Sequence, residues 1–187
     1  MDKINLNNDK QVLVGNEKFV EMLSEEQIQN RIAELGKQIT EDYKGKLPIF
    51  IGVLNGSFMF LADLIKHVGI HCEIDFLKLS SYGDHKISSG KVKTLKELNA
   101  DINERHIIIV EDIVDTGLSI NYIEQMMKEH NPASFKVASL LVKPESLKYD
   151  IKIDYTGFEI PNKFVIGYGL DYAQKYRNLS SIYVLSE

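Results

Sequence analysis

One apolar run in the middle of the chain constrains its fold more than any other feature. Residues 107–110 are four β-branched residues in a row, which is typical of a strand buried on both faces of a parallel sheet. Two carboxylates, Glu111 and Asp112, follow at once, and apolar residues recur at helical spacing from Ile120 onward. A strand, an acidic loop and a helix in this order predict a ligand site at the carboxyl edge of an open α/β sheet.

The loop between this strand and the helix carries residues suited to phosphate. Asp115, Thr116, Gly117 and Ser119 supply a bend, two hydroxyls and a residue free to adopt unusual backbone angles. Amides of such a loop and of a helix N-terminus bind phosphate, and paired carboxylates suit a hard cation or sugar hydroxyls. Without further context, Asp115 is equally a turn residue, and Thr116 and Ser119 are equally helix caps.

The rest of the chain alternates between strand-like and helix-like segments. Ser24 and Gln27 form a capping box that predicts the start of a helix, and a second helix is expected after Ser57. We expect further strands at residues 12–14, 48–53, 70–79, 135–142, 151–158 and 182–185. This alternation predicts an α/β fold with a central, mainly parallel sheet flanked by helices. Residues 80–90 are polar and rich in Ser and Gly, which is typical of a lid.

The composition narrows the class of protein. The chain has 187 residues, a hydrophobic fraction of 44% and a formal net charge of −5, which indicates one soluble domain and disfavours a nucleic-acid binder. Its single cysteine, Cys72, excludes an internal disulfide and fits a reducing compartment. The polar N-terminus has no signal-peptide pattern, and no apolar run reaches the roughly 18 residues of a membrane span. We therefore expect a cytoplasmic protein.

Residues 107–119, IIIVEDIVDTGLS, resemble the phosphoribosyl pyrophosphate (PRPP) motif of the type I phosphoribosyltransferases. The segments ASLLVKP (138–144), GFEIPNKF (157–164) and VIGYGLDYAQKYR (165–177) narrow the resemblance to bacterial-like hypoxanthine-guanine phosphoribosyltransferases. It runs from about Pro48 to the end of the chain. It implies the type I phosphoribosyltransferase fold over 1–187, with a lid at about 80–91 containing Ser81 and Tyr82, and a small hood from about 1–20 and 155–180.

The resemblance also implies a function. The 5-phosphoribosyl group would pass from PRPP to hypoxanthine or guanine with Mg²⁺ as cofactor, giving IMP or GMP and pyrophosphate. The family implies a homodimer or homotetramer, with no nucleic-acid or membrane partner. Two alternatives stay open: a regulator that keeps the PRPP-binding fold but binds nucleic acid, and an enzyme whose main substrate is xanthine or another base.

Individual residues take roles through the same resemblance. Asp115 is the expected general base, and Lys143 the expected donor to the purine 6-oxo group. Asn55 stands where the family often has Lys or Arg, and the family often has a non-proline cis peptide at the position of the bond between Leu54 and Asn55. The residues implied to contact the ribose and the 5′-phosphate are Glu111, Asp112, Asp115, Thr116, Gly117, Leu118 and Ser119, and those implied to contact pyrophosphate are Asn55, Gly56 and Arg177. The residues implied to surround the purine are Ile113, Lys143, Phe164, Val165 and Asp171. Mg²⁺ would be bound by Glu111, Asp112 and Asp171, partly through ligand and water.

Overall fold

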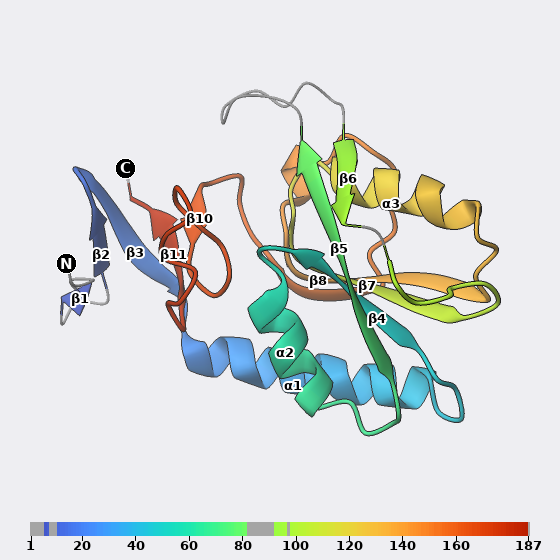
Figure 1. Ribbon diagram of the computed structural model, residues 1–187. Coiled ribbons are helices and arrows are strands. Elements are labelled where there is room, and N and C mark those ends of the chain that lie inside the picture. The colour runs from blue at the N-terminus through green and yellow to red at the C-terminus, as the bar shows by residue number, and fades with distance from the viewer. Residues whose placement is uncertain (1–5, 8–10, 82–91, 97, 187) are drawn as a thin grey trace.

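A computed structural model describes residues 6–7, 11–81, 92–96 and 98–186 (Figure 1), and every structural statement below concerns these residues. They form three α-helices and two sheets. The helices are α1 (Glu25–Asp42), α2 (Phe58–Lys66) and α3 (Leu118–Lys128), and a short 3₁₀ turn covers Pro144–Ser146.

The main sheet has six strands in the order β6-β5-β4-β7-β8-β9. They are β4 (Ile49–Leu54), β5 (Glu73–Ser81), β6 (Val92–Lys96), β7 (His106–Val114), β8 (Ser134–Val142) and β9 (Tyr155–Glu159). All neighbouring pairs are parallel except β5 with β6. The expected mainly parallel sheet is therefore confirmed.

The apolar run of β7 is buried on both faces, as its composition predicted. Ile108 and Val110 pack in a core cluster with side chains of α1 and α2. Ile107 and Ile109 point to the opposite face and pack in a second cluster with side chains of α3. Because successive strand residues alternate between faces, only a strand covered on both sides needs an unbroken apolar run.

A second, antiparallel sheet forms the hood beside the main sheet (Figure 1). Its strand order is β1-β2-β3-β11-β10, so it joins the two ends of the chain. The strands are β1 (Leu6–Asn7), β2 (Gln11–Val14), β3 (Glu17–Leu23), β10 (Val165–Ile166) and β11 (Ile182–Leu185). The hood limits predicted from the sequence need correction: β9 belongs to the main sheet, while β3 and β11 extend the hood beyond residues 20 and 180.

Several element limits also differ from those expected. The strand β7 continues to Val114, so Glu111 and Asp112 lie within it instead of after it. Residues 151–154 are not part of β9, and β5 begins at Glu73 instead of residue 70. The capping box of α1 is confirmed, with Gln27 N donating to Ser24 Oγ and Ser24 N donating to Gln27 Oε1. Among the described helices, none is long and apolar enough to cross a membrane.

Candidate active site

The carboxyl ends of β4, β7 and β8 meet at one edge of the main sheet. The register sets Gly52 opposite Val110 and Val114 opposite Val142, so the loops that follow these strands become neighbours. A cavity of about 300 Å³ lies at this edge, beside the ends of β4 and β7. Its lining consists of Val53, Leu54, Asn55, Gly56, Leu79, Glu111, Asp112, Ile113, Leu118, Ser119, Asp171 and Arg177. Ligands bind at this edge in open α/β sheets.

Glu111 and Asp112 bring two carboxylates to the floor of this cavity. Burial, and then the nearby charge of Asp112, raise the pKa of Glu111 well above its usual range. Burial also raises the pKa of Asp112 to about 6, although its hydrogen bond from the Ile113 amide and the charge of Arg177 act in the opposite direction. Desolvated carboxylates with raised pKa values favour a proton or a cation.

Gly56 comes directly against Asp112. A Cβ atom added to Gly56 would lie 1.6 Å from Asp112 Oδ2, so only glycine leaves room for this carboxylate. The peptide bond between Leu54 and Asn55 is cis, a geometry that the sequence alone left open. In the same loop, the buried Ser57 hydroxyl donates to the carbonyl of Val53 at 2.7 Å. The loop after β4 therefore rests on the acidic floor of the cavity.

The loop after β7 leads into α3 through Gly117. This residue is the N-cap of α3, has a φ of 82° and provides no side-chain cap. The Leu118 amide lies 3.4 Å from Thr116 Oγ1, while Leu118 and Ser119 line the cavity. The helix therefore begins at the cavity with the positive end of its dipole, which suits an anion. Gly117, and not Thr116 or Ser119, holds the N-cap position of α3, while Thr116 Oγ1 accepts the hydrogen bond of the first helical amide, that of Leu118.

Lys143 and Asp115 form an ion pair, with 3.0 Å between Nζ and Oδ2. The Lys143 side chain is 8% exposed and that of Asp115 is 48% exposed. The pairing follows from the register, because the Lys143 amide donates to the Val114 carbonyl at 2.9 Å and so continues the contact of β8 with β7. A buried ammonium thus faces an accessible carboxylate.

Arg177 and Asp171 reach the cavity from the segment between β10 and β11. Arg177 Nη2 lies 2.7 Å from Asp171 Oδ1, and Nη1 donates to the Gly169 carbonyl at 2.6 Å. Both residues are close enough to Asp112 for their charges to affect its pKa. Arg177 therefore lines the same cavity as Asn55 and Gly56, the two other residues expected to contact pyrophosphate.

The expected purine-binding residues are less closely gathered. Ile113 lines the cavity, whereas Lys143, Phe164 and Val165 are not among its lining residues. Phe164 is 47% exposed and makes edge-on contacts with Phe19 and Tyr172, at 6.2 and 5.8 Å between ring centroids. Val165 is buried in β10. An exposed aromatic ring leaves a face open for stacking.

The residues present fit a magnesium ion that shares its shell with a substrate. Among the described residues, no group of three or more His, Cys, Asp or Glu side chains could hold a metal. Glu111 and Asp112 are adjacent, desolvated carboxylates, and Mg²⁺ is commonly bound through one or two carboxylates together with substrate oxygens and water. The protein therefore supplies part of a coordination shell.

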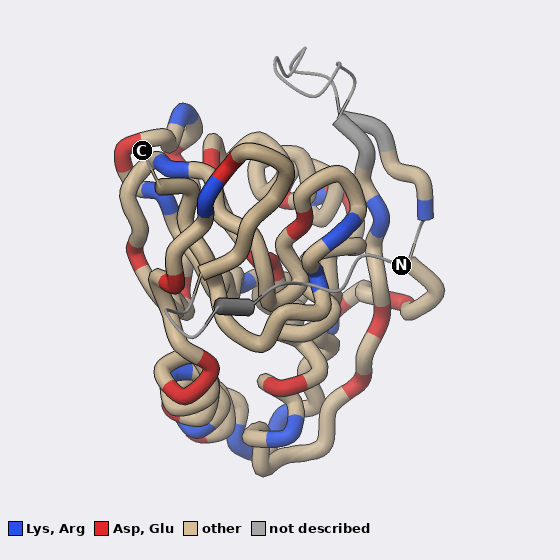
Figure 2. The backbone as a smooth tube through the Cα atoms, turned by 90° about the vertical axis from the view of Figure 1, so that its left-hand side faces the viewer, with Lys and Arg blue, Asp and Glu red and all other residues tan. Residues whose placement is uncertain are grey.

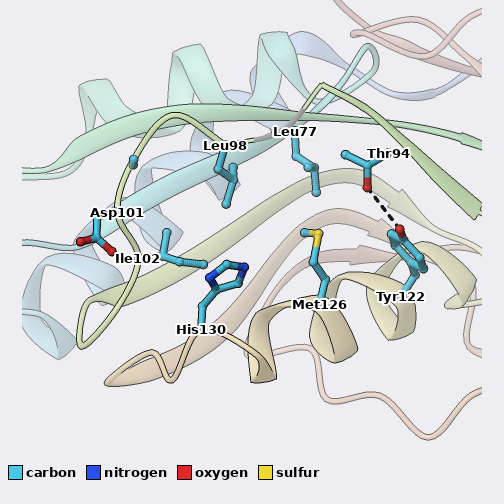
Figure 3. Close-up of a pocket in the computed structure, with 9 residues that line it drawn as sticks. Leu77, Thr94, Leu98, Asp101, Ile102, Tyr122, Met126 and His130 are labelled. Atoms are coloured by element: carbon cyan, nitrogen blue, oxygen red, sulfur yellow. Dashed lines mark hydrogen bonds between the residues drawn. The ribbon is translucent and has the colours of Figure 1, made fainter.

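A larger cavity, of about 640 Å³, lies between β5, β6 and α3 (Figure 3). Leu77, Ile102 and Met126 give it an apolar wall, and the Thr94 hydroxyl lies 3.2 Å from that of Tyr122. Its acidic and imidazole side chains, Asp101 and His130, lie toward one end, away from Tyr122. The lining of this larger cavity does not bring carboxylates and cations together, as the lining of the smaller cavity does. The volume of a cavity therefore does not identify the reactive site.

Some predictions fall outside what the structure describes, and some cavity residues were not predicted. Tyr82 and most of the expected lid lie outside the described residues, and of Ser81 only its place at the end of β5 is described. Val53 and Leu79 line the cavity without having been singled out. They could have been predicted from their positions near the carboxyl ends of β4 and β5, where ligands bind in such sheets.

Comparison with known proteins identifies close relatives. The phosphoribosyl transferase domain family matches residues 21–173. A hypoxanthine-guanine phosphoribosyltransferase of Bacillus subtilis is 48% identical over 164 residues, covering 88% of this chain and 91% of the relative. One of Streptococcus thermophilus is 46% identical, covering 89% and 92%. The crystal structure of a hypoxanthine phosphoribosyltransferase from Staphylococcus aureus matches with a TM-score of 0.85 at 43% identity, covering 89% and 90%.

Proposed function

Because the chain belongs to the phosphoribosyltransferase family, as a hypoxanthine-guanine phosphoribosyltransferase of purine salvage, we propose that its substrates are PRPP with hypoxanthine and guanine and that its cofactor is Mg²⁺. The products would be IMP or GMP and pyrophosphate. The observation that carries this proposal is the meeting of the acidic floor, the α3 N-terminus and the Lys143–Asp115 pair at one sheet edge.

The acidic floor would hold the ribose end of PRPP. In this reaction the bond from C1′ to pyrophosphate breaks while a purine nitrogen bonds to C1′, and positive charge builds on the sugar. The carboxylates of Glu111 and Asp112 would stabilise this charge and bind the ribose hydroxyls and Mg²⁺. The ion would neutralise charge on the pyrophosphate oxygens. Asp171 would be a further ligand on the pyrophosphate side.

The two phosphate ends of PRPP would bind on opposite sides of this floor. The backbone amides and hydroxyls of residues 116–119 would hold the 5′-phosphate at the start of α3. On the other side, the amides of Asn55 and Gly56 and the guanidinium of Arg177 would hold pyrophosphate. Since Asn55 has no charge, Arg177 would be the main cation for pyrophosphate in this chain.

Lys143 would select a 6-oxopurine. Its buried ammonium can donate to the 6-oxo group of hypoxanthine or guanine, whereas adenine has an amine donor at that position. Two opposed donors would leave both groups unsatisfied, which is how polar pockets reject near-identical substrates. Phe164 and Ile113 would pack on the two faces of the purine, and the backbone of Val165 would contact its edge.

Asp115 would take the proton that the purine releases. The attacking imidazole ring must lose a proton when its nitrogen bonds to C1′, and the accessible Asp115 carboxylate is held beside the expected 6-oxo donor. A positioned carboxylate within hydrogen-bond reach can accept that proton. We propose the same role whether the base is hypoxanthine or guanine.

The family resemblance further supports a homodimer or homotetramer, which sedimentation velocity would measure. It does not support the regulator alternative. Figure 2 shows acidic and basic positions intermixed along the coloured backbone. A nucleic-acid-binding surface normally concentrates Lys and Arg.

An absorbance assay tests the proposal. The protein is mixed with PRPP and Mg²⁺ and with hypoxanthine, guanine, xanthine or adenine in separate reactions, and each is repeated with excess EDTA. We expect turnover with hypoxanthine and guanine, weak or no turnover with adenine, and loss of turnover with EDTA. Turnover with xanthine alone would support the alternative substrate, and activity that persists in EDTA would refute the Mg²⁺ requirement.

A further inference from the structure

The turn at residues 167–169 has an unusual backbone. Gly167, Tyr168 and Gly169 all have φ in the left-handed region, at 96°, 49° and 97°. Glycine adopts these angles freely, but a bulky residue such as Tyr168 does so rarely. Such a conformation persists only where the surrounding structure fixes it, and it tends to occur at functional sites.

The Tyr168 side chain is anchored between two helices. It is 1% exposed, and its hydroxyl donates to Asp63 Oδ2 of α2 at 2.5 Å. Gln29 of α1 donates to the same carboxylate oxygen at 2.7 Å and lies 3.3 Å from the Tyr168 hydroxyl. Although burial acts to raise it, hydrogen bonds from Lys66, Tyr168 and Gln29 hold the pKa of Asp63 below its usual value. Asp63 is therefore a charged acceptor at neutral pH.

Gly169, the residue after Tyr168, packs against the loop that follows β4. A Cβ atom added to Gly169 would lie 2.1 Å from the carbonyl oxygen of Gly56, so the two backbones are in direct contact. Gly169 also exchanges hydrogen bonds with Arg177: its amide donates to the Arg177 carbonyl at 2.9 Å, and its carbonyl accepts from Nη1 at 2.6 Å. Gly169 thus connects both parts of the pyrophosphate side of the cavity.

We propose that Tyr168 is a positioning residue for pyrophosphate, acting through the contact of Gly169 with Gly56 and Arg177. This inference rests on the pyrophosphate site proposed above. Tyr168 touches no substrate in this account: its hydroxyl, held by Asp63, fixes the backbone on which the Gly56 loop and the Arg177 guanidinium are aligned. Small displacements of such groups cost affinity because binding geometry is narrow.

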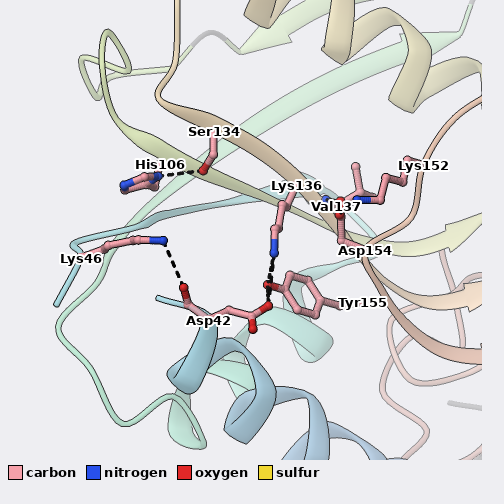
Figure 4. A network of polar contacts seen from close by, with 9 residues as sticks. All are labelled: Asp42, Lys46, His106, Ser134, Lys136, Val137, Lys152, Asp154 and Tyr155. Atoms are coloured by element: carbon pink, nitrogen blue, oxygen red, sulfur yellow. Dashed lines mark hydrogen bonds and ion pairs between the residues drawn. The ribbon is translucent and has the colours of Figure 1, made fainter. Parts of the chain in front are cut away.

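The chain offers a matched control in β9, an outer strand of the main sheet. Tyr155, at the start of β9, is also 1% exposed, and its hydroxyl donates to Asp42 Oδ2 at 2.6 Å (Figure 4). Lys136 lies 3.0 Å from the same hydroxyl. Removing either tyrosine hydroxyl deletes a part-buried hydrogen bond to a helix carboxylate, but only Tyr168 adjoins the pyrophosphate side of the site.

The test compares Tyr168→Phe with Tyr155→Phe in the full chain. Melting temperature, kcat, the KM values for PRPP and hypoxanthine, and inhibition by added pyrophosphate are measured for each. We expect both variants to melt at a lower temperature. Only Tyr168→Phe should raise the KM for PRPP and the pyrophosphate inhibition constant, each on the order of tenfold, with the KM for hypoxanthine changed by less than about twofold.

A second pair of variants covers the case in which Tyr168→Phe folds poorly. Asp63→Asn keeps an acceptor for the hydroxyl, whereas Asp63→Ala removes it, so Asp63→Asn should retain a PRPP KM near that of the unmodified enzyme and Asp63→Ala should not. Equal KM values for PRPP across all these variants, or equal rises in the Tyr155 control, would overturn the inference. An unmodified enzyme without any turnover would instead refute the proposed function.

Discussion

Lys143 Nζ lies 3.0 Å from Asp115 Oδ2, so the proposed 6-oxo donor and the proposed proton acceptor are in direct contact with each other. The pair arises because β7 and β8 are parallel and in a register that places Val114 beside Val142. A purine that meets both groups would present its 6-oxo group to the ammonium and its imidazole edge to the carboxylate. Each partner can therefore be tested by its own kinetic effect.

Asp115→Asn should lower kcat by about 10²–10⁴-fold, because an amide cannot accept the purine proton as a base. The KM for PRPP should change little. Single-turnover kinetics measure this directly, since they isolate the chemical step from product release. Asp150→Asn, at an exposed position, is the charge-matched control. An Asp115→Asn rate within about twofold of the unmodified enzyme would exclude the general-base role.

Lys143→Met should weaken the use of hypoxanthine and guanine and reduce discrimination against adenine. Methionine keeps most of the buried volume but provides no donor, and a hydrogen bond to a charged group contributes about 1.5–3 kcal/mol. We expect kcat/KM for hypoxanthine to fall by roughly 10–100-fold, with a smaller change for adenine. Lys44→Met, at an exposed lysine, provides the comparison. Unchanged selectivity between the two bases would contradict the assignment.

Gly56→Ala should impair PRPP binding without a matching loss of purine affinity. The added methyl group would meet Asp112 Oδ2 at 1.6 Å, so the loop after β4 or the carboxylate must move. Titration calorimetry with PRPP and Mg²⁺ should show a loss of affinity on the order of 10²-fold. At Gly69 an added Cβ would meet only ordinary contacts, at 3.4 Å from Thr40, so Gly69→Ala should bind PRPP normally. Equal binding by both variants would show that the Gly56 contact is unimportant.

Asp112 should make the ligand-free protein less stable as pH rises. Its folded-state pKa of about 6 lies above the ordinary value of 3.8, so its contribution is fully present below about pH 4 and is lost as pH rises through about 6. Asp112→Asn, which is always neutral, should therefore be more stable than the unmodified protein at pH 7 by at most about 3 kcal/mol, since one pKa unit corresponds to about 1.4 kcal/mol.

Thermal melts of both proteins across this pH range, without PRPP or Mg²⁺, measure the difference in stability. The gap in melting temperature should close near about pH 4. Asp150→Asn controls for the loss of a surface charge. A gap that stays constant with pH, or that reverses in sign at neutral pH, would show that Asp112 is not destabilising when it is charged.

The sequence predicted the main sheet well because local patterns encode it. The run at residues 107–110 needs burial on both faces, and Ser24 with Gln27 fixes the start of α1 through contacts three residues apart. The hood was harder to predict. Its β3 strand alternates weakly and pairs with β11, far along the chain, so no local signal marked it.

Motif and resemblance proposed which residues belong to the candidate site, but they did not predict how these residues are arranged. Residues such as Asp115 and Lys143 were proposed from motif and resemblance, while their pairing depends on strand register. Tyr168 carried no local signal, since a tyrosine between two glycines is an ordinary turn in sequence; its role depends on Asp63, which lies 105 residues away in the chain. Contacts of this kind follow from tertiary structure and cannot be read from spacing.

Phosphorus NMR of PRPP tests the central claim most directly, because it follows bond cleavage at the anomeric carbon without any assumption about the base. With Mg²⁺ and hypoxanthine present, PRPP signals should be replaced by equal amounts of pyrophosphate and a nucleotide 5′-phosphate, and they should persist when hypoxanthine is omitted. PRPP that stays intact with hypoxanthine, or that is hydrolysed equally with and without it, would contradict phosphoribosyl transfer to a purine.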